Sequence, residues 1–237
     1  MENQFKTALI TGASKGIGKA IAIGLAKMGY LTILIGRNQD DLKSVQEEII
    51  RNGCSEPVVF TRNITDSEKI KATVTEIVEK YDRIDLLVNN AGIHFSGTLE
   101  LPETDFRKML DTNLTAQFVI LQEVVPVMQQ QQSGYIFNVV SRSGKVGFAG
   151  SGGYCASKFG LLGLNESLYR ELTPQGIKVT ALCPAWVNTN MAQKAGTPLQ
   201  FEEMIQPDDL DKTIRWLLEL SPGACVKEVV ITNPKSL

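Results

Sequence analysis

A serine, a tyrosine and a lysine in the segment NVVSRSGKVGFAGSGGYCASK could together carry out acid–base chemistry. Tyr154 and Lys158 are four residues apart and would share one face of a helix, and Ser141 precedes them in a glycine-rich stretch. Tyrosine and lysine normally keep their protons at neutral pH, because each has a pKa of about 10. A lysine cation beside a phenol favours the phenolate, so we expect Lys158 to lower the pKa of Tyr154 and make it a usable acid or base.

A glycine-rich turn near the start of the chain has the composition of a nucleotide site. TGASKGIG follows a strand pattern and opens a helix pattern, and Gly12, Gly16 and Gly18 have the spacing G-x-x-x-G-x-G. Glycine lets a backbone approach a ligand closely, and a helix N-terminus offers free N–H groups to a pyrophosphate. Tight packing of the helix on the sheet would use the same glycines, so the turn alone leaves both interpretations open.

The charges around this turn indicate which dinucleotide would bind. An NAD site typically has an acidic residue at the end of the second strand, where it bonds the ribose 2′-hydroxyl. Here the strand LTILIG ends at Gly36 and is followed by Arg37, and Lys15 lies inside the glycine turn. Two cations at this place suit a 2′-phosphate, since arginine bonds phosphate through two parallel N–H groups. The sequence therefore predicts NADP(H) as the cofactor in preference to NAD(H).

Alternating strand and helix patterns would position these residues. Apolar runs predict strands at 7–12, 31–36, 57–64, 84–92, 134–141, 176–185 and 225–232, and amphipathic runs predict helices at 18–29, 40–53, 66–81, 104–131, 154–172 and 207–220, the fourth of them bent at Pro126. Apolar strands that alternate with helices predict one doubly wound α/β Rossmann domain over residues 1–237, with a parallel sheet of about seven strands and helices on both faces. The Gly-, Pro- and Gln-containing stretch at about 190–206 is predicted to be a mobile substrate loop, although a plain surface loop would have the same composition.

Composition argues against several other functions. The net charge is −2 without a run of lysine or arginine, so we expect no nucleic-acid partner, and no apolar stretch approaches the ~18 residues of a membrane span. The start of the chain has no signal-peptide pattern, and the four cysteines lack metal-type spacing, so we expect reduced thiols, a cytoplasmic protein and no metal. The single histidine, His94, leaves a Ser-His-Asp hydrolase or a zinc dehydrogenase without its side chains, and we favour a structural role for it over a place at a pocket mouth.

Taken together, these motifs resemble the short-chain dehydrogenase/reductase family. The family patterns TGxxxGxG, NNAG and YxxxK and the upstream serine are matched at 11–18, 89–92, 154–158 and Ser141, and the resemblance extends from Lys6 to about Leu220. It implies an NADPH-dependent oxidoreductase that reduces a ketone or aldehyde to an alcohol by hydride transfer. A protein that binds NADP(H) only to sense it is the alternative from another class, and a complete set of catalytic residues argues against it.

The resemblance also assigns roles to individual residues. It implies that Tyr154 is the acid–base, Ser141 the donor to the substrate oxygen, Lys158 the group that holds the nicotinamide ribose, and Asn113 the holder of a water that passes protons to Lys158. It further implies contacts with the cofactor from Gly12, Ser14, Lys15, Gly16, Ile17, Gly18, Arg37, Asn38, Asn63, Ile64, Asn90, Ala91, Gly92, Tyr154, Lys158, Pro184, Val187 and Thr189.

Several positions depart from the family pattern. Asn63 stands where the family often has Asp, and we expect its amide to keep the contact with the adenine. Ala185 replaces the glycine of a Pro-Gly pair, which is a mild change. The C-terminal CVKEVVITNPKSL lacks the paired glycines common in acyl-carrier reductases, so we expect a homodimer through the long helices, with a homotetramer as the other possibility.

The substrate is the least determined feature. The main alternative within the family is a 3-oxoacyl-(acyl-carrier-protein) reductase, whose docking arginines correspond to Gln132 and Gln175 here. Because an acidic carrier needs a basic docking site, we favour a small-molecule carbonyl or alcohol substrate. The pocket lip is expected to include Ser143, Lys145, Phe148, Tyr154, Trp186 and Met191.

Overall fold

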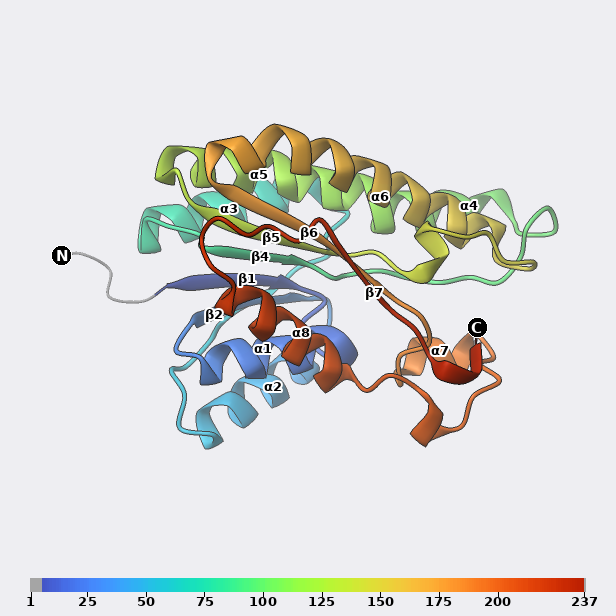
Figure 1. The fold of residues 1–237 in the computed structure, drawn as a ribbon. Coiled ribbons are helices and arrows are strands. Elements are labelled where there is room, and N and C mark those ends of the chain that lie inside the picture. The colour runs from blue at the N-terminus through green and yellow to red at the C-terminus, as the bar shows by residue number, and fades with distance from the viewer. Residues whose placement is uncertain (1–5, 237) are drawn as a thin grey trace.

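Seven parallel strands form the centre of the molecule. The structure is a computed structural model and describes residues 6–236. The strands stand in the order β3-β2-β1-β4-β5-β6-β7 (Figure 1), so the chain runs outward from β1 in one direction and then from β4 in the other. Their bounds are β1 Thr7–Thr11, β2 Leu31–Gly36, β3 Val58–Thr61, β4 Leu86–Asn89, β5 Gly134–Val139, β6 Ile177–Pro184 and β7 Glu228–Ile231.

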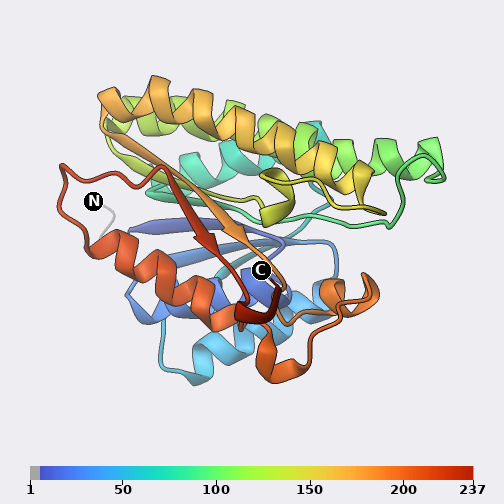
Figure 2. The same ribbon diagram turned by 45° about the vertical axis from the view of Figure 1, so that its right-hand side comes forward.

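Helices cover both faces of this sheet, as Figures 1 and 2 show from two sides. One face carries α1 (Gly16–Lys27), α2 (Gln39–Arg51) and α8 (Pro207–Glu219). The other carries α3 (Ser67–Tyr81), α5 (Ala116–Gln131) and α6 (Gly152–Leu172), and the short helices α4 (Glu103–Leu110) and α7 (Asn190–Lys194) lie toward the end of the sheet where the strands finish. The predicted doubly wound α/β fold with a seven-stranded parallel sheet is confirmed.

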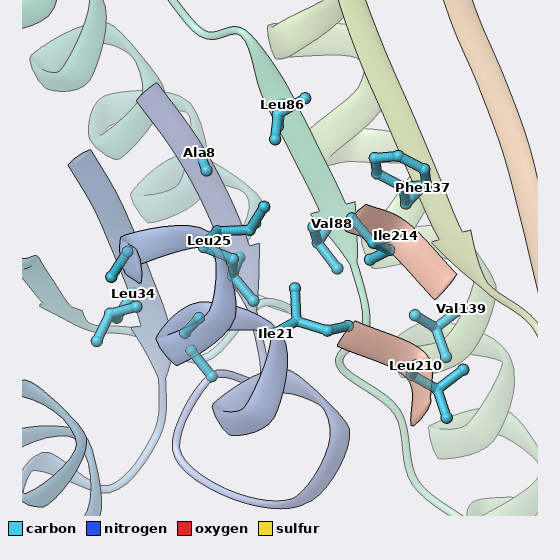
Figure 3. Packing of buried hydrophobic residues seen from close by; sticks show 14 of the residues in the cluster. Ala8, Ile21, Leu25, Leu34, Leu86, Val88, Phe137, Val139, Leu210 and Ile214 are labelled. Carbon is cyan, nitrogen blue, oxygen red and sulfur yellow. The ribbon is translucent and has the colours of Figure 1, made fainter. Parts of the chain in front are cut away.

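Alternation along the strands builds a separate core on each face. In β1, Ala8 and Ile10 face the cluster that includes Ile21 of α1 and Ile214 of α8 (Figure 3), while Leu9 faces the cluster under α3 and α5. All five of these side chains are fully buried. Each buried aliphatic side chain contributes about 1.5–3 kcal/mol, so the two cores hold the strand ends in fixed register.

The long helix expected over 104–131 is divided in the structure. Its first part is α4, its second part is α5, and a π-helical turn at Asp111–Thr115 joins them. Pro126 lies inside α5, which continues to Gln131, so the change of helical geometry falls around Asn113 instead of at the proline. A π-helical turn inside an α-helix is rare and frequently occurs at functional sites. The sequence shows proline plainly but carries no comparable signal for a π turn.

The stretch at 190–206 has more regular structure than a plain loop. It contains α7 and a 3₁₀ turn at Phe201–Glu203, and a parallel bridge between Val187 and Ile205 joins its two ends. Its movement as a lid stays a prediction. Across residues 6–236, no helix has the length and apolar character needed to cross a membrane.

Candidate active site

A cleft of about 1150 Å³ opens at the carboxyl ends of β1, β4, β5 and β6. The strand order reverses between β1 and β4, and ligands of open α/β sheets bind at such a switch point. The lining comes from segments that are far apart in the sequence, from the turn after β1 to the start of α8. The volume is slightly above the usual range of about 300–1,000 Å³ for a small-molecule pocket, which suits a long ligand together with a second molecule.

Three positions in the turn between β1 and α1 require glycine, through their backbone conformation or through lack of space. Gly12 and Gly16 have φ of 64° and 55°, a region that L-residues rarely adopt. A Cβ on Gly18 would lie 2.3 Å from the carbonyl oxygen of Gly12. Gly18 does not line the cleft, so of the three glycines it serves packing, while Gly12 and Gly16 face the cleft.

The segment after β4 braces this turn from the side. The Asn90 amide donates to the carbonyl oxygen of Thr11 at 2.8 Å, and the Thr11 hydroxyl accepts the N–H groups of Asn90 and Ala91 at 2.9 and 3.0 Å. Hydrogen bonds therefore join the end of β1 to the segment after β4, on the two sides of the switch point. They hold the backbone of the glycine turn in position at the cleft.

The N-terminus of α1 is open toward an anion. Its N-cap, Lys15, makes no side-chain cap bond, and the first turn carries no acidic residue. Free N–H groups and the positive end of the helix dipole therefore border the cleft beside a turn that only glycine can form. This arrangement fits the pyrophosphate of a dinucleotide.

Two arginines line the far end of the cleft. The pairing of Gly36 with Thr61 between β2 and β3, continued by the Arg62 N–H bonding to the Gly36 oxygen at 2.8 Å, brings the backbones of Arg37 and Arg62 next to each other. Both line the cleft. Sequence analysis found Arg37 and missed Arg62, since only the strand register makes them neighbours. Asn38 also lines the cleft, but its side chain caps α2 by accepting from the Asp41 N–H.

Ser141 and Tyr154 meet at the middle of the cleft. Ser141 follows β5 and its hydroxyl accepts the Ser143 N–H at 3.0 Å, while Tyr154 lies in the first turn of α6. Burial raises the pKa of Tyr154 to about 12, and the hydrogen bond with the Ser141 side chain opposes part of this rise. Tyr154 therefore holds its proton firmly at neutral pH.

Lys158 lies one helical turn beyond Tyr154, as the spacing predicts. Its Nζ is 5.8 Å from the centre of the Tyr154 ring and donates to the carbonyl oxygen of Val139 at 2.9 Å. Burial lowers the pKa of Lys158 to about 8. The expectation that Lys158 lowers the pKa of Tyr154 is not met by the protein's own groups, because the desolvation of the phenol is the dominant effect.

Asn113 is close to this group but does not line the cleft. It is fully buried in the π-helical turn, where its amide accepts the Ile93 N–H at 2.8 Å and donates to the Ile93 oxygen at 2.9 Å. The same amide donates to the Ser157 hydroxyl at 3.0 Å, and Ser157 donates to the backbone carbonyl oxygen of Tyr154 at 2.7 Å. Asn113 thus ties the loop after β4 to the start of α6.

Most of the other predicted residues line the cleft. The predicted cofactor contacts Ser14, Ile17, Asn63, Ile64, Ala91, Gly92, Pro184, Val187 and Thr189 line it. Of the predicted lip, Ser143, Phe148, Trp186 and Met191 line it too. Lys145 does not, because its ammonium pairs with Glu228 of β7 at 2.5 Å. Sequence analysis missed Arg62, Lys19, Ser96, Thr112 and Asn188, which have no motif to mark them.

The comparisons with known proteins agree with this geometry. A model of the short chain dehydrogenase family matches residues 6–200. The chain belongs to this family. Short-chain dehydrogenases are oxidoreductases, and the resemblance and the enzyme class predicted from the sequence are confirmed.

Individual members of the short-chain dehydrogenase family align along most of the chain. The 3-oxoacyl-(acyl-carrier-protein) reductase FabG of Staphylococcus aureus is 36% identical over 203 residues, which are 85% of this chain and 82% of that protein. A betaketoacyl-(ACP) reductase structure from Bacteroides thetaiotaomicron is 49% identical with a TM-score of 0.87, covering 98% of this chain and 99% of that one.

A third relative bears on the cofactor. An alcohol dehydrogenase from the archaeon Thermococcus sibiricus, complexed with 5-hydroxy-NADP, is 26% identical with a TM-score of 0.89 over 98% of this chain and 97% of its own. The cofactor predicted from the sequence, NADP(H), is in line with this short-chain dehydrogenase and is confirmed.

Proposed function

We propose that this chain is an NADPH-dependent reductase that converts the carbonyl group of a small ketone or aldehyde to an alcohol. The observation that carries the proposal is the meeting of Ser141, Tyr154 and Lys158 in the same cleft as the open N-terminus of α1. One end of the cleft suits a dinucleotide and the other end offers hydroxyl groups to a carbonyl oxygen.

Tyr154, Ser141 and Lys158 have separate roles in the proposed reaction. When bound, NADPH supplies the hydride that adds to the carbonyl carbon. Tyr154, which the raised pKa of about 12 keeps protonated, gives its proton to the carbonyl oxygen and is left as phenolate. Ser141 donates a hydrogen bond to the same oxygen as negative charge develops there. Lys158, one helical turn beyond Tyr154, would hold the nicotinamide ribose of the bound cofactor.

Cations at the adenosine end support the choice of NADPH. Lys15, Arg37 and Arg62 line that part of the cleft, and no acidic residue stands at the end of β2. Lys19 also lines it, but Glu48 holds its ammonium at 2.7 Å. The two guanidinium groups could each give charge-assisted hydrogen bonds to a 2′-phosphate.

The surface charges favour a small substrate over an acyl-carrier protein. Lys145 is paired with Glu228, and Arg170 and Lys227 are both paired with Glu166. The two glutamines that stand at the family's docking arginines are uncharged, and Gln175 is hydrogen-bonded to Gln129 at 2.9 Å. An acidic carrier would meet little unneutralised positive charge among these groups.

A 3-oxoacyl-(acyl-carrier-protein) reductase is the second candidate, and the names of the relatives from Staphylococcus aureus and Bacteroides thetaiotaomicron favour it. The two candidates differ in whether the carrier contributes to recognition. The test is kcat/KM for one 3-oxoacyl chain on the carrier protein and on a short thiol. We expect no preference and little salt dependence; a large preference that falls with salt would establish the second candidate.

Oxidation of NADPH with a panel of ketones and aldehydes tests the reductase itself. We expect turnover with at least one member of the panel. Tight binding of NADPH without turnover of any compound would instead indicate a protein that senses the cofactor.

We also propose a cytoplasmic homodimer in which two copies meet along α5 and α6. An apolar groove between these helices is lined by Phe118, Leu121, Val125, Pro126, Leu164 and Leu168. Phe118 is 43% exposed there, so its ring is available to a second copy of the chain that packs on the groove. The four free cysteines support a reducing compartment. Light scattering would give the mass of the assembly.

A further inference from the structure

His94 lies in the substrate half of the cleft, beside the predicted acid. It follows the NNAG segment after β4, lines the cleft and is only partly buried. Its ring meets the ring of Tyr154 edge to face, with centroids 4.9 Å apart and an angle of 67° between the planes. The imidazole and the Tyr154 ring therefore border the same part of the cleft.

The side chains around His94 already have partners, whereas its own ring nitrogens do not. Asn113, Ser157 and Lys158 are each held by hydrogen bonds within the protein. Throughout residues 6–236 no hydrogen bond or ion pair involves the imidazole of His94; its one recorded contact is with a ring. Because His94 is only partly buried and lines the cleft, its ring nitrogens are left to bond water or a molecule bound there.

The neighbours of His94 hold the loop in place without it. The N–H and the carbonyl of Ile93 both bond to the Asn113 amide, and the Phe95 N–H bonds to the sulfur of Met109 at 3.3 Å. The backbone on each side is therefore fixed by other residues. The imidazole is left to face the cleft, where it can serve a ligand.

The protonation state of the His94 imidazole determines which ligand atoms it can hydrogen-bond. Burial lowers its pKa below the usual value, so the ring is neutral at neutral pH. A neutral imidazole has one N–H that donates and one nitrogen that accepts. It can therefore hydrogen-bond an uncharged oxygen, as a donor to a carbonyl or ester oxygen or as an acceptor from a hydroxyl.

We infer that His94 is a specificity-determining residue that hydrogen-bonds a second oxygen of the substrate, close to the carbonyl that is reduced. The preferred substrates are then carbonyl compounds with such an oxygen, for example β-oxo esters. This inference rests on the proposed reductase function and assigns a role that the family motifs do not contain. A site built to bond an oxygen rejects the analogue that lacks it, because the protein's polar group is then left without a partner.

Two substrates with the same chain length test this role. The measurement is kcat/KM with NADPH for ethyl acetoacetate and for the straight-chain methyl ketone in which methylene groups replace the ester. The ratio of the two values is compared between variants, so that the intrinsic reactivity of each substrate cancels. His94→Phe keeps the ring against Tyr154 and removes the nitrogens, and His94→Gln keeps a donor and an acceptor.

We expect His94→Phe to lower the ratio by about tenfold through loss of activity with the ester, while the methyl ketone is reduced at nearly the original rate. His94→Gln should keep the ratio within about threefold of the original, because its amide replaces the hydrogen bond. An unchanged ratio in His94→Phe, with both substrates turned over, would overturn the inference and leave the reductase function standing. Absence of turnover with every carbonyl compound would instead overturn the proposed function, and this inference with it.

A second measurement needs no variant. His94 is the only histidine in the chain, so the imidazole signals of an untagged, nitrogen-15-labelled sample belong to it without assignment. In the NADPH complex, saturating ethyl 3-hydroxybutanoate, the product of the ester, should shift these signals, and the alcohol from the methyl ketone should shift them much less. Equal shifts with the two alcohols would contradict a hydrogen bond to the second oxygen.

Discussion

The two halves of the cleft are built in different ways. In the cofactor half the glycine turn presents its backbone, with two glycines at positive φ and with Asn90 and Thr11 joining β1 to β4 through hydrogen bonds, and cationic side chains stand only at the adenosine end. The substrate half consists of side chains, among them Phe148 and Met191, which are 41% and 37% exposed, and His94, whose nitrogens have no protein partner across residues 6–236. The first half recognises the dinucleotide, whose structure does not vary. The second half recognises the substrate through side chains that can be substituted without disturbing the sheet.

Tyr154 lies where the two halves meet, and its replacement should have the largest effect. Tyr154→Phe keeps the ring and its contact with His94 and removes the proton donor. We expect turnover to fall by about a hundredfold or more, with the dissociation constant for NADPH unchanged. Steady-state rates and a fluorescence titration measure the two quantities. If the variant kept more than a few per cent of the rate, the acid–base assignment would be wrong.

A methyl group in the cofactor half should disturb the fold as well as the function. In Gly18→Ala the new Cβ would lie 2.3 Å from the Gly12 oxygen and 2.5 Å from the Asn90 amide, so backbone must move. We expect a loss of about 1–3 kcal/mol in the free energy of unfolding, and weaker NADPH binding. Chemical denaturation measures the first.

Gly163→Ala is the matched control for this change. Gly163 is also helical, but a Cβ there meets nothing within 4 Å. Alanine is the better helix former by about 1 kcal/mol, so the control should be as stable as the original protein or slightly more stable. Equal destabilisation by both substitutions would contradict the tight packing of the glycine turn.

Replacing one arginine at the adenosine end should change cofactor preference alone. Arg37→Ala removes a charge-assisted phosphate contact, so we expect KM for NADPH to rise about tenfold, with little change for NADH. Arg62→Ala should act in the same direction. Lys19→Ala, which removes a cation already held by Glu48, should have a smaller effect. Equal kcat/KM for the two cofactors in the original protein would contradict the assignment of this end to a 2′-phosphate.

The smallest expected effect is a dependence of NADPH binding on pH. The pKa of Lys158 is lowered to about 8, so its cation is present at pH 7 and is lost as the pH rises through that value. The 2′-phosphate, with a second pKa of about 6, is fully charged throughout this range. We expect the dissociation constant of NADPH to increase severalfold between about pH 7 and pH 9.

Lys158→Met provides the comparison for this measurement. Its NADPH affinity should be weaker and should not change over the same range, because the titrating cation is gone. A dependence on pH of the same size in Lys158→Met would show that another group is responsible.

The difference between the two halves also explains what the sequence could predict. The fold was predicted from the alternation of apolar strand patterns with helix patterns. The turn at Gly12 was predicted from the spacing of glycines, and the pair formed by Tyr154 and Lys158 from their four-residue spacing. All three are local patterns. Arg62 became visible only through the register of β2 and β3, which no single segment contains. The pKa of Tyr154 was misjudged because desolvation depends on everything that packs around the phenol.

Long-range contacts also explain why Asn113 and Lys145 lie elsewhere than the sequence predicted. Asn113 was recognised, but its place in a π-helical turn behind the cleft depends on its bonds with Ile93. Lys145 was expected at the pocket lip and instead pairs with Glu228, a residue more than eighty positions later in the chain. Contacts of this kind follow from the folded arrangement and have no counterpart in residue spacing.

The end of the chain has a practical consequence for handling the protein. Asn233 accepts the N–H of Trp186, a cleft residue, and donates to the carbonyl oxygens of Trp186 and Glu203. Lys235 adds an ion pair with Glu203. The last described residues therefore lie beside the 3₁₀ turn at Phe201–Glu203, whereas the N-terminal end of β1 lies at the opposite side of the molecule (Figure 1). A purification tag fused to the N-terminus would leave the substrate wall undisturbed, and a tag at the C-terminus would compete with the residues that hold it.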